Sequence, residues 1–208
     1  MKYLTIVFDD GPSRLMCEMA DKIAAYGWHA AFALIGRKIN EETLPMLRYV
    51  IDNGFQLVSH GQEHAHMDAL PSREAIIEEF IRPIQTVEEK LGYHITMART
   101  PFLTTNEEIL SVAKELNLPL LGWGMNDGRD WHHETTSETV ERSILGSLRD
   151  GAIGGLHVMD HTAKALDTIL PGMKEAGYAI LTPEELFAIK GITPPPGVQV
   201  NNVNDCKG

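Results

Sequence analysis

The stretch TIVFDDGP, residues 5–12, is an apolar run that ends in two adjacent carboxylates, a glycine and a proline. The run predicts a buried strand over residues 3–8. Strand-like and helix-like patterns then alternate about seven times along the chain, which predicts parallel strands joined by crossover helices. No dinucleotide-type glycine fingerprint follows the first strand, so we expect an α/β fold of the barrel type rather than a Rossmann sheet.

The remaining elements follow from apolar spacing and from glycine and proline stops. We expect strands at residues 30–35, 55–58, 118–123, 152–156 and 178–181, a short strand leading to 97–98, and helices at 15–26, 41–52, 72–91, 106–116, 137–148, 162–176 and 184–189. Pro83 lies inside the third helix, where we expect a kink or a break. We expect one domain over residues 1–190 and an extended tail or linker stub over residues 191–208, which are rich in Pro, Gly and Asn.

The composition is ordinary for a globular protein, with 43% hydrophobic and 23% charged residues in a chain of 208. The formal net charge of -11 argues against a nucleic acid or an anionic membrane as partner, and no stretch is as long as a membrane-spanning helix. The two cysteines, Cys17 and Cys206, lack zinc-type spacing, so any metal ion must use nitrogen and oxygen ligands. We expect a monomer.

Polar residues gather where the predicted strands end. In barrels of this kind the carboxyl ends of the strands form the active face. We therefore interpret these residues as parts of one site: Asp9 and Asp10 after the first strand, His60 and His64 after the third, Arg99 and Pro101 after the fourth, Asp130 and Trp131 beyond the fifth, and His157 after the sixth.

The carboxylate doublet, Asp9 and Asp10, has two interpretations. In the structural one, either carboxylate caps the turn that Gly11 and Pro12 make. In the functional one, the two carboxylates are too close for both to stay ionised cheaply without a cation. A metal ion on one of them would relieve the repulsion and leave the other free as a base.

His60 and His64 are spaced as HGQEH and follow a strand, so a turn must bring them together. Two imidazoles and one carboxylate can form a three-ligand metal site with open positions for water. A pair of surface histidines is the alternative interpretation. His66 is a rival to His64 as a ligand.

Four further side chains have a functional and a structural interpretation each. Arg99 is either a surface salt-bridge residue or the group that holds the free carboxylate ionised. Asp130 and Trp131 are either loop and core residues or a partner for a histidine and the lining of a sugar groove. His157 is either a core histidine or a general acid, with His161 as its rival.

Taken together, these segments resemble the polysaccharide deacetylases with the NodB homology domain, also called carbohydrate esterase family 4. The likeness covers nearly the whole chain, from Tyr3 to about Lys190. The family's motifs appear in order as FDDGP (8–12), HGQEH (60–64), RTPF (99–102), DGRDW (127–131) and LH (156–157). The chain departs from the family at Gly61, where serine or threonine is usual. The resemblance implies a distorted α/β barrel.

The resemblance also implies a metal site and a base. Asp10, His60 and His64 would bind a divalent metal ion, which would be zinc, with cobalt or nickel as alternatives. Asp9 would be the general base, and Arg99 would orient it.

The same resemblance assigns the acid and the substrate contacts. The backbone N–H of Phe102 would help to hold the oxyanion, and Asp130 would tune His157 as the general acid. The side chains expected to contact the substrate are Trp131, Leu156 and Pro101.

These roles imply a metal-dependent hydrolase that removes acetyl groups from acetylated polysaccharides or oligosaccharides. Two substrates compete, namely N-acetylglucosamine polymers and O-acetylxylan. The alternative function is that of a carbohydrate-binding relative without catalysis. The chain runs almost directly into a strand, so we expect no signal peptide within it. A polymeric substrate favours an extracellular protein, and a cytoplasmic enzyme that acts on a soluble oligosaccharide is the alternative.

Overall fold

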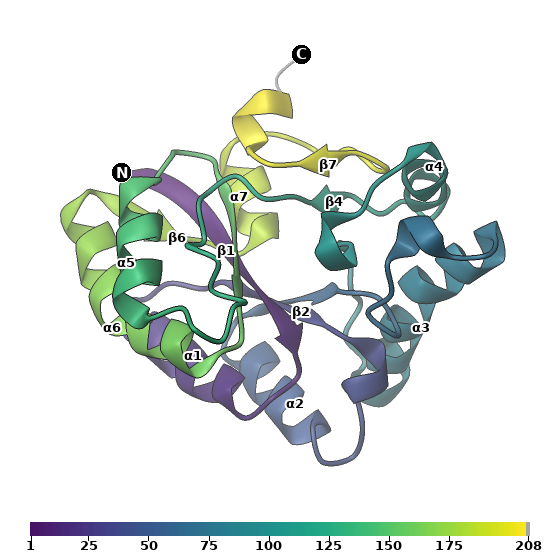
Figure 1. Cartoon of the computed structure of the whole chain (residues 1–208), viewed down its shortest axis with the longest axis horizontal. Helices are drawn as coiled ribbons and strands as arrows, with labels where there is room; N and C mark the ends of the chain where they lie inside the picture. Colours follow the sequence, from purple (N-terminus) through teal and green to yellow (C-terminus); the bar gives the residue numbers. More distant parts are fainter. Residues whose placement is uncertain (207–208) are drawn as a thin grey trace.

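A computed structural model describes residues 1–206 of the chain, with strand β1 (Lys2–Gly11) at its centre (Figure 1). The main sheet has five parallel strands. Its order is β3 (Gln56–Ser59), β2 (Ala31–Leu34), β1 and β5 (Ile153–His157), with β6 (Tyr178–Ile180) paired to the beginning of β1. The pairing partners of β1 therefore change along its length, which makes the sheet irregular at its centre.

Two further strands continue the pairing beyond β3. β4 (Leu120–Leu121) pairs in parallel with β7 (Gln199–Val200), and Ala98 forms a bridge to β3 on one side and to β4 on the other. After β7, the carbonyl of Asn201 accepts a hydrogen bond from the N–H of Ile153 in β5, at 2.9 Å. Backbone hydrogen bonds thus lead from β3 through β4 and β7 round to β5, as expected of a distorted α/β barrel.

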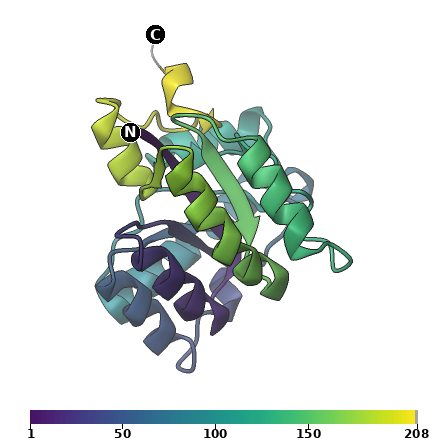
Figure 2. The same ribbon diagram turned by 90° about the vertical axis from the view of Figure 1, so that its left-hand side faces the viewer.

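The helices lie around this sheet, and Figure 2 shows α5 and α6 side by side over β5. The α-helices are α1 (Leu15–Ala24), α2 (Leu44–Asp52), α3 (Arg73–Leu91), α4 (Glu107–Glu115), α5 (Ser137–Gly146), α6 (Asp160–Glu175) and α7 (Pro183–Ile189). Short 3-10 helices are η1 (Gly36–Lys38), η2 (Met67–Ala69), η3 (Pro101–Leu103) and η4 (Val203–Cys206). No helix among residues 1–206 combines the length and the apolar character needed to cross a membrane.

β1 is buried on both faces, as is usual for parallel strands covered by helices. Leu4, Ile6 and Phe8 pack into a cluster with residues of α1 and α6. Val7 points the other way and packs with small side chains such as Ala31. Because both faces of β1 are buried, its sequence is continuously apolar up to the carboxyl end of the strand.

The predicted elements are confirmed in type and order, with shorter strands in the middle of the chain. The expected strand at 97–98 is reduced to the bridge at Ala98, and only Leu120–Leu121 pair within the predicted strand 118–123. The expected break at Pro83 is wrong, because α3 continues through it. Pro83 is buried in the packing of α3 against η1, and this tertiary packing outweighs the lost helical hydrogen bond.

The segment after Lys190 packs onto the domain, which differs from the extended tail expected from its composition. β7 joins β4, and Val200 and Val203 are buried. The side chains of Asn202 and Asn204 both donate to the carbonyl of Asp150, at 3.0 and 2.8 Å. The last two positions of the predicted tail, 207–208, lie outside the described residues.

Candidate active site

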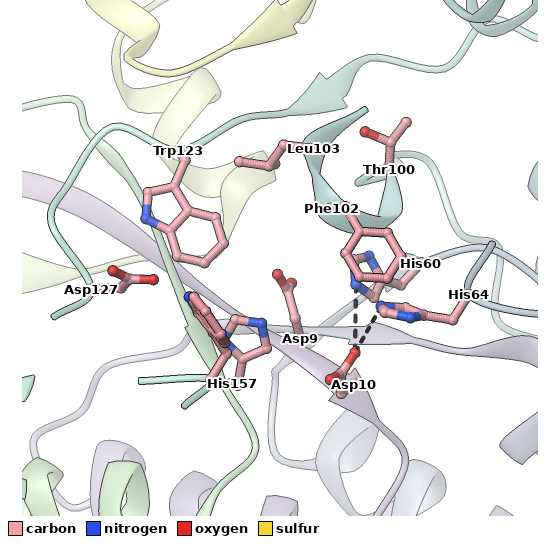
Figure 3. Close-up of a pocket in the computed structure, with 11 residues that line it drawn as sticks. Asp9, Asp10, His60, His64, Thr100, Phe102, Leu103, Trp123, Asp127 and His157 are labelled. Atoms are coloured by element: carbon pink, nitrogen blue, oxygen red, sulfur yellow. Dashed lines mark ion pairs between the residues drawn. The ribbon is translucent and has the colours of Figure 1, made fainter. Parts of the chain in front are cut away.

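The end of β1 brings two adjacent carboxylates into one pocket. Successive side chains of a regular strand point to opposite faces. Here the pairing of β1 with β2 shifts between Phe8 and Gly11, and Asp10 has a φ of 72°, in the left-handed region. Such a bulge re-aims a side chain. Asp9 and Asp10 therefore both face the cavity at the carboxyl end of the sheet (Figure 3).

Asp10 lies against two imidazoles, as the dashed lines in Figure 3 show. Its Oδ1 is 3.2 Å from Nε2 of His64 and 3.7 Å from Nε2 of His60. One ligand atom from each of the three residues lies within 4.8 Å of the other two. Burial alone would raise the pKa of Asp10, but the imidazoles of His64 and His60 outweigh it and lower that pKa to about 2. The carboxylate is therefore ionised at neutral pH.

This donor set fits a zinc-type ion. Nδ1 of His60 lies 2.8 Å from the carbonyl oxygen of Arg99, which assigns the proton to Nδ1 and leaves the Nε2 lone pair facing Asp10. Burial lowers the pKa of His60, which keeps its ring neutral. Neutral imidazole and ionised carboxylate are the forms that bind metals. Oδ1 of Asp10 is buried without a hydrogen-bond partner in the described chain, and a cation among these ligands would satisfy it.

Asp9 and Arg99 form a buried ion pair beside these ligands. Nε of Arg99 is 3.0 Å from Oδ2 of Asp9, although the angle of approach is not that of a hydrogen bond. The guanidinium carbon lies 4.5 Å from the ring centroid of Trp123. Burial lowers the pKa of Arg99, but arginine stays charged in proteins. The guanidinium therefore lies against one oxygen of Asp9, whose other oxygen, Oδ1, has no hydrogen-bond partner within residues 1–206.

Asp130 holds His157 from behind the cavity. Its Oδ1 lies 2.8 Å from Nδ1 of His157, and its Oδ2 accepts hydrogen bonds from the backbone N–H of His157 and the hydroxyl of Thr162. Burial alone would lower the pKa of His157, but the hydrogen bond to Asp130 and the charge of Asp9 raise it. Asp9 and His157 are also register partners on β1 and β5, so their side chains stand on neighbouring strands.

One cavity of about 450 Å³ connects these groups. Two large aromatic side chains at its wall are half exposed, Phe102 at 56% and Trp131 at 50%. They give the cavity an apolar mouth above a polar floor, which suits a ligand with both kinds of surface. The full lining is Asp9, Asp10, His60, His64, Thr100, Phe102, Leu103, Trp123, Asp127, Trp131 and His157.

Phe102 occupies a strained turn at the edge of the cavity. Phe102 and Leu103 both have a φ of 54°, which costs on the order of 1–3 kcal/mol for each non-glycine residue. No turn or tertiary hydrogen bond in the described chain uses the Phe102 N–H. The Phe102 ring stacks on His66, with centroids 3.8 Å apart and planes within 5°. His66 is held in this stack, so the geometry favours His64 as the ligand beside Asp10.

The structure brings most of the predicted site residues together, either in the cavity lining or directly behind it. Leu156 and Pro101 are not among the described side chains that line the cavity. Leu156 precedes His157 on β5, so its side chain points to the opposite face and packs in the core. Pro101 is buried and approaches Gly61.

Four lining residues are absent from the sequence-based prediction: Thr100, Leu103, Trp123 and Asp127. Trp123 ends the run expected as a strand, and its place at a strand end was the available signal. Asp127 opens the DGRDW motif, and burial raises its pKa. His161, the rival acid, instead contacts the carbonyl oxygen of Asp130 through Nε2, at 2.5 Å.

Comparison with known proteins matches residues 1–121 to a family model described as polysaccharide deacetylase. The chain is 28% identical over 196 residues to a bifunctional xylanase/deacetylase of Pseudobutyrivibrio xylanivorans, an overlap of 93% of this chain and 32% of that protein. It is 28% identical over 191 residues to a peptidoglycan-N-acetylglucosamine deacetylase of Listeria monocytogenes, covering 91% of this chain and 40% of that one. The chain thus spans less than half the length of these two curated relatives.

A solved structure covers nearly the whole chain. It is a family 4 acetyl xylan esterase from Clostridium thermocellum in complex with a cobalt ion. The two structures align with a TM-score of 0.89 at 28% sequence identity, over 97% of this chain and 99% of that one. The agreement extends beyond the residues of the family model and includes the segment after residue 190.

Proposed function

The chain belongs to the polysaccharide deacetylase family, and on that premise we propose that it is a metal-dependent hydrolase that removes acetyl groups from an acetylated carbohydrate. The observation that carries the proposal is that three candidate metal ligands, Asp10, His60 and His64, meet Asp9 and His157 in one cavity. The relatives named above act, by their names, on xylan and on peptidoglycan. They support two substrate classes, O-acetylxylan and polymers that contain N-acetylglucosamine.

The proposed ion is zinc, with cobalt or nickel as alternatives, and its ligands are Asp10, His60 and His64. Two imidazoles and a carboxylate suit zinc and related ions, and the cobalt ion bound by the acetyl xylan esterase supports cobalt as an alternative. When bound, such an ion supplies a Lewis acid for the acetyl carbonyl and lowers the pKa of a water towards about 7.

Asp9 is the proposed general base. Its Oδ2 faces Arg99, while its unpartnered Oδ1 is free to accept a proton from the attacking water. The Phe102 N–H, which no backbone group in the described chain occupies, would donate to the oxyanion that forms on the acetyl carbonyl. The strained φ of Phe102 is consistent with a turn held in place for this purpose.

His157 is the proposed general acid. Its Nδ1 is engaged by Asp130, so Nε2 is the atom that can give a proton to the leaving group. For an N-acetyl substrate the C–N bond breaks and the sugar leaves as an amine. For an O-acetyl substrate the C–O bond breaks and the sugar leaves as an alcohol. Acetate is the second product in both cases.

Acetate release tests the proposal. The purified chain, first stripped with a chelator, would be assayed with and without added zinc or cobalt on acetylxylan, chitooligosaccharides and peptidoglycan. We expect acetate from at least one substrate, only when metal is present. A chain that binds these carbohydrates but releases no acetate with any of the metals would refute catalysis and favour the carbohydrate-binding alternative.

A pair of histidine variants tests the ligand assignment. We expect His64→Ala to lose tight metal binding, because it removes an imidazole beside Asp10. His66→Ala is the matched control, since its ring stacks on Phe102 and contacts none of the three proposed ligands through a hydrogen bond. Metal content after dialysis, measured by mass spectrometry, distinguishes the two. Loss of metal in His66→Ala alone would refute the assignment.

A further inference from the structure

A buried acidic side chain contacts the loop between His60 and His64, called the histidine loop below. Glu79 stands in the middle of α3 and is 5% exposed. A buried carboxylate ordinarily has a cationic partner. Within residues 1–206, Glu79 has no lysine, arginine or histidine at ion-pair distance. Its carboxyl group must therefore be stabilised by something other than a salt bridge.

The partners of Glu79 are backbone N–H groups of the histidine loop. Its Oε2 accepts a hydrogen bond from the N–H of Gln62 at 2.9 Å, and both carboxylate oxygens accept from the N–H of Glu63, at 3.1 and 3.2 Å. Successive N–H groups that converge on one anion form a nest. These two residues lie between His60 and His64, so the carboxylate holds the loop that separates two of the proposed metal ligands.

The other edge of the same loop is tied to η1. The carbonyl oxygens of Gly61 and Gln62 accept hydrogen bonds from the N–H groups of Gly36 and Arg37, both at 2.9 Å. The loop is thus clamped through its carbonyls on one side and through its N–H groups on the other. Its two ends have left-handed backbones, with a φ of 77° at Gly61 and 59° at His64. A left-handed non-glycine residue such as His64 needs support of this kind.

Gly61 allows the carboxylate to come this close. A Cβ at position 61 would lie 2.7 Å from Oε2 of Glu79 and 3.1 Å from Cγ of Pro101. Gly61 also carries no hydroxyl that could bond within the loop. The anchoring group is therefore supplied by α3, eighteen residues further along the chain from Gly61 to Glu79.

We propose that Glu79 is a positioning residue for the metal site, which sets the separation and direction of the His60 and His64 rings by anchoring the loop between them. The inference rests on the metal-dependent function proposed above. Loss of the carboxylate would leave the N–H groups of Gln62 and Glu63 without acceptors and would release His64 from its left-handed conformation. Removal of such outer partners typically lowers metal affinity about 10–100-fold.

Cobalt binding to the full chain tests this role without reference to catalysis. Wild type, Glu79→Gln and Glu79→Ala would be titrated with Co²⁺ after chelator treatment, with the visible absorption of the bound ion followed together with the Kd. Glu78→Ala is the matched control, because Glu78 is the preceding residue of α3 but is exposed and, within residues 1–206, pairs only with Arg82. Thermal unfolding of the metal-free variants measures stability separately.

We expect Glu79→Ala to weaken Co²⁺ binding about 10–100-fold and to alter the absorption spectrum, which reports ligand geometry. Glu79→Gln keeps the shape and one acceptor oxygen, so it should fall between wild type and Glu79→Ala. Glu78→Ala should match wild type. If Glu79→Ala does not fold, Glu79→Gln decides the question in the same titration.

A lower unfolding temperature with unchanged Kd and spectrum in the Glu79 variants would overturn the proposal, because that result describes a purely structural residue. This failure is distinct from a failure of the proposed function. A wild-type chain that binds Co²⁺ but releases no acetate would refute the hydrolase, while the Kd series would still judge the role of Glu79.

Discussion

Replacement of Gly155 by alanine tests whether the buried Asp9–Arg99 pair controls catalysis. Gly155 lies on β5, where a Cβ would overlap Nη2 of Arg99 and would lie 2.7 Å from Cε3 of Trp123. Ordinary contacts of a Cβ begin at 3.4 Å, so the indole alone must move by about 0.7 Å, and the guanidinium by more. The guanidinium cannot move into solvent easily, because Arg99 is wholly buried.

The size of the effect follows from this overlap. Overpacking of a closely packed interior costs about 1–3 kcal/mol in the free energy of unfolding. The displaced guanidinium would no longer hold Oδ2 of Asp9 at 3.0 Å. Misplacement of a catalytic group by about 1 Å can lower the rate about 100-fold. We therefore expect Gly155→Ala to lower kcat about 100-fold.

The neighbouring glycine provides a matched control. A Cβ at Gly154 would meet Sδ of Met125 at 3.2 Å and the Thr5 carbonyl oxygen at 3.4 Å, and the flexible methionine can yield. Initial rates of acetate release and urea unfolding would be measured for both variants and wild type, at a temperature where all are folded. Equal kcat in Gly155→Ala and Gly154→Ala, at measured stabilities that differ, would refute the role assigned to the Asp9–Arg99 geometry.

Three further predictions concern the acid, the metal and the C-terminal segment. Because the hydrogen bond to Asp130 raises the pKa of His157, Asp130→Asn should lower that pKa. His157 would then lose its proton at lower pH, so the alkaline limb of the kcat/KM profile should move to lower pH. An alkaline limb that does not move would exclude His157 as the acid. Dialysis against a chelator should abolish acetate release, and stoichiometric Zn²⁺ or Co²⁺ should restore it within the same sample; full activity in metal-free protein would contradict a metal site. Val203→Ala should lower the free energy of unfolding by about 1–2 kcal/mol, because each buried methylene contributes about 0.8 kcal/mol. Val198→Ala should have little effect, because Val198 is 45% exposed. Equal urea midpoints for the two variants would argue that the C-terminal segment contributes nothing to stability.

The order of strands and helices could be predicted because it is encoded locally. The apolar run before Asp9, the Ser72 cap of α3 and the stop at Gly92 each act through neighbours in sequence, and the structure has all three. The packing of residues 192–206 could not be predicted in this way. Its composition is that of a loop, and only the distant partners of Val200 and Asn201 give it a place in the sheet.

The candidate site shows the same division between local and distant information. The predicted strand ends indicate Asp10, His60 and His157 as site residues, because parallel strands deliver their carboxyl ends to one face. The choice between His64 and His66 depends on the path of a turn, which the sequence does not specify. Glu79 carries no signal at all in sequence, because a glutamate on an amphipathic helix has the pattern of an exposed residue.

The adjacent carboxylates at the end of β1 are explained by the bulge between them and by separate counter-charges. In a straight strand one of the two side chains would point away from the site, so a doublet would place only one acid in the cavity. The left-handed backbone of Asp10 turns its carboxylate towards His60 and His64, while Asp9 stays against Arg99. Each acid is thereby paired in a different direction, Asp10 with two imidazoles and Asp9 with a guanidinium. On the function proposed above, Asp10 would hold the metal ion while Asp9 faces the same cavity as the base, so two adjacent acids would serve two separate roles in the hydrolysis of an acetyl group.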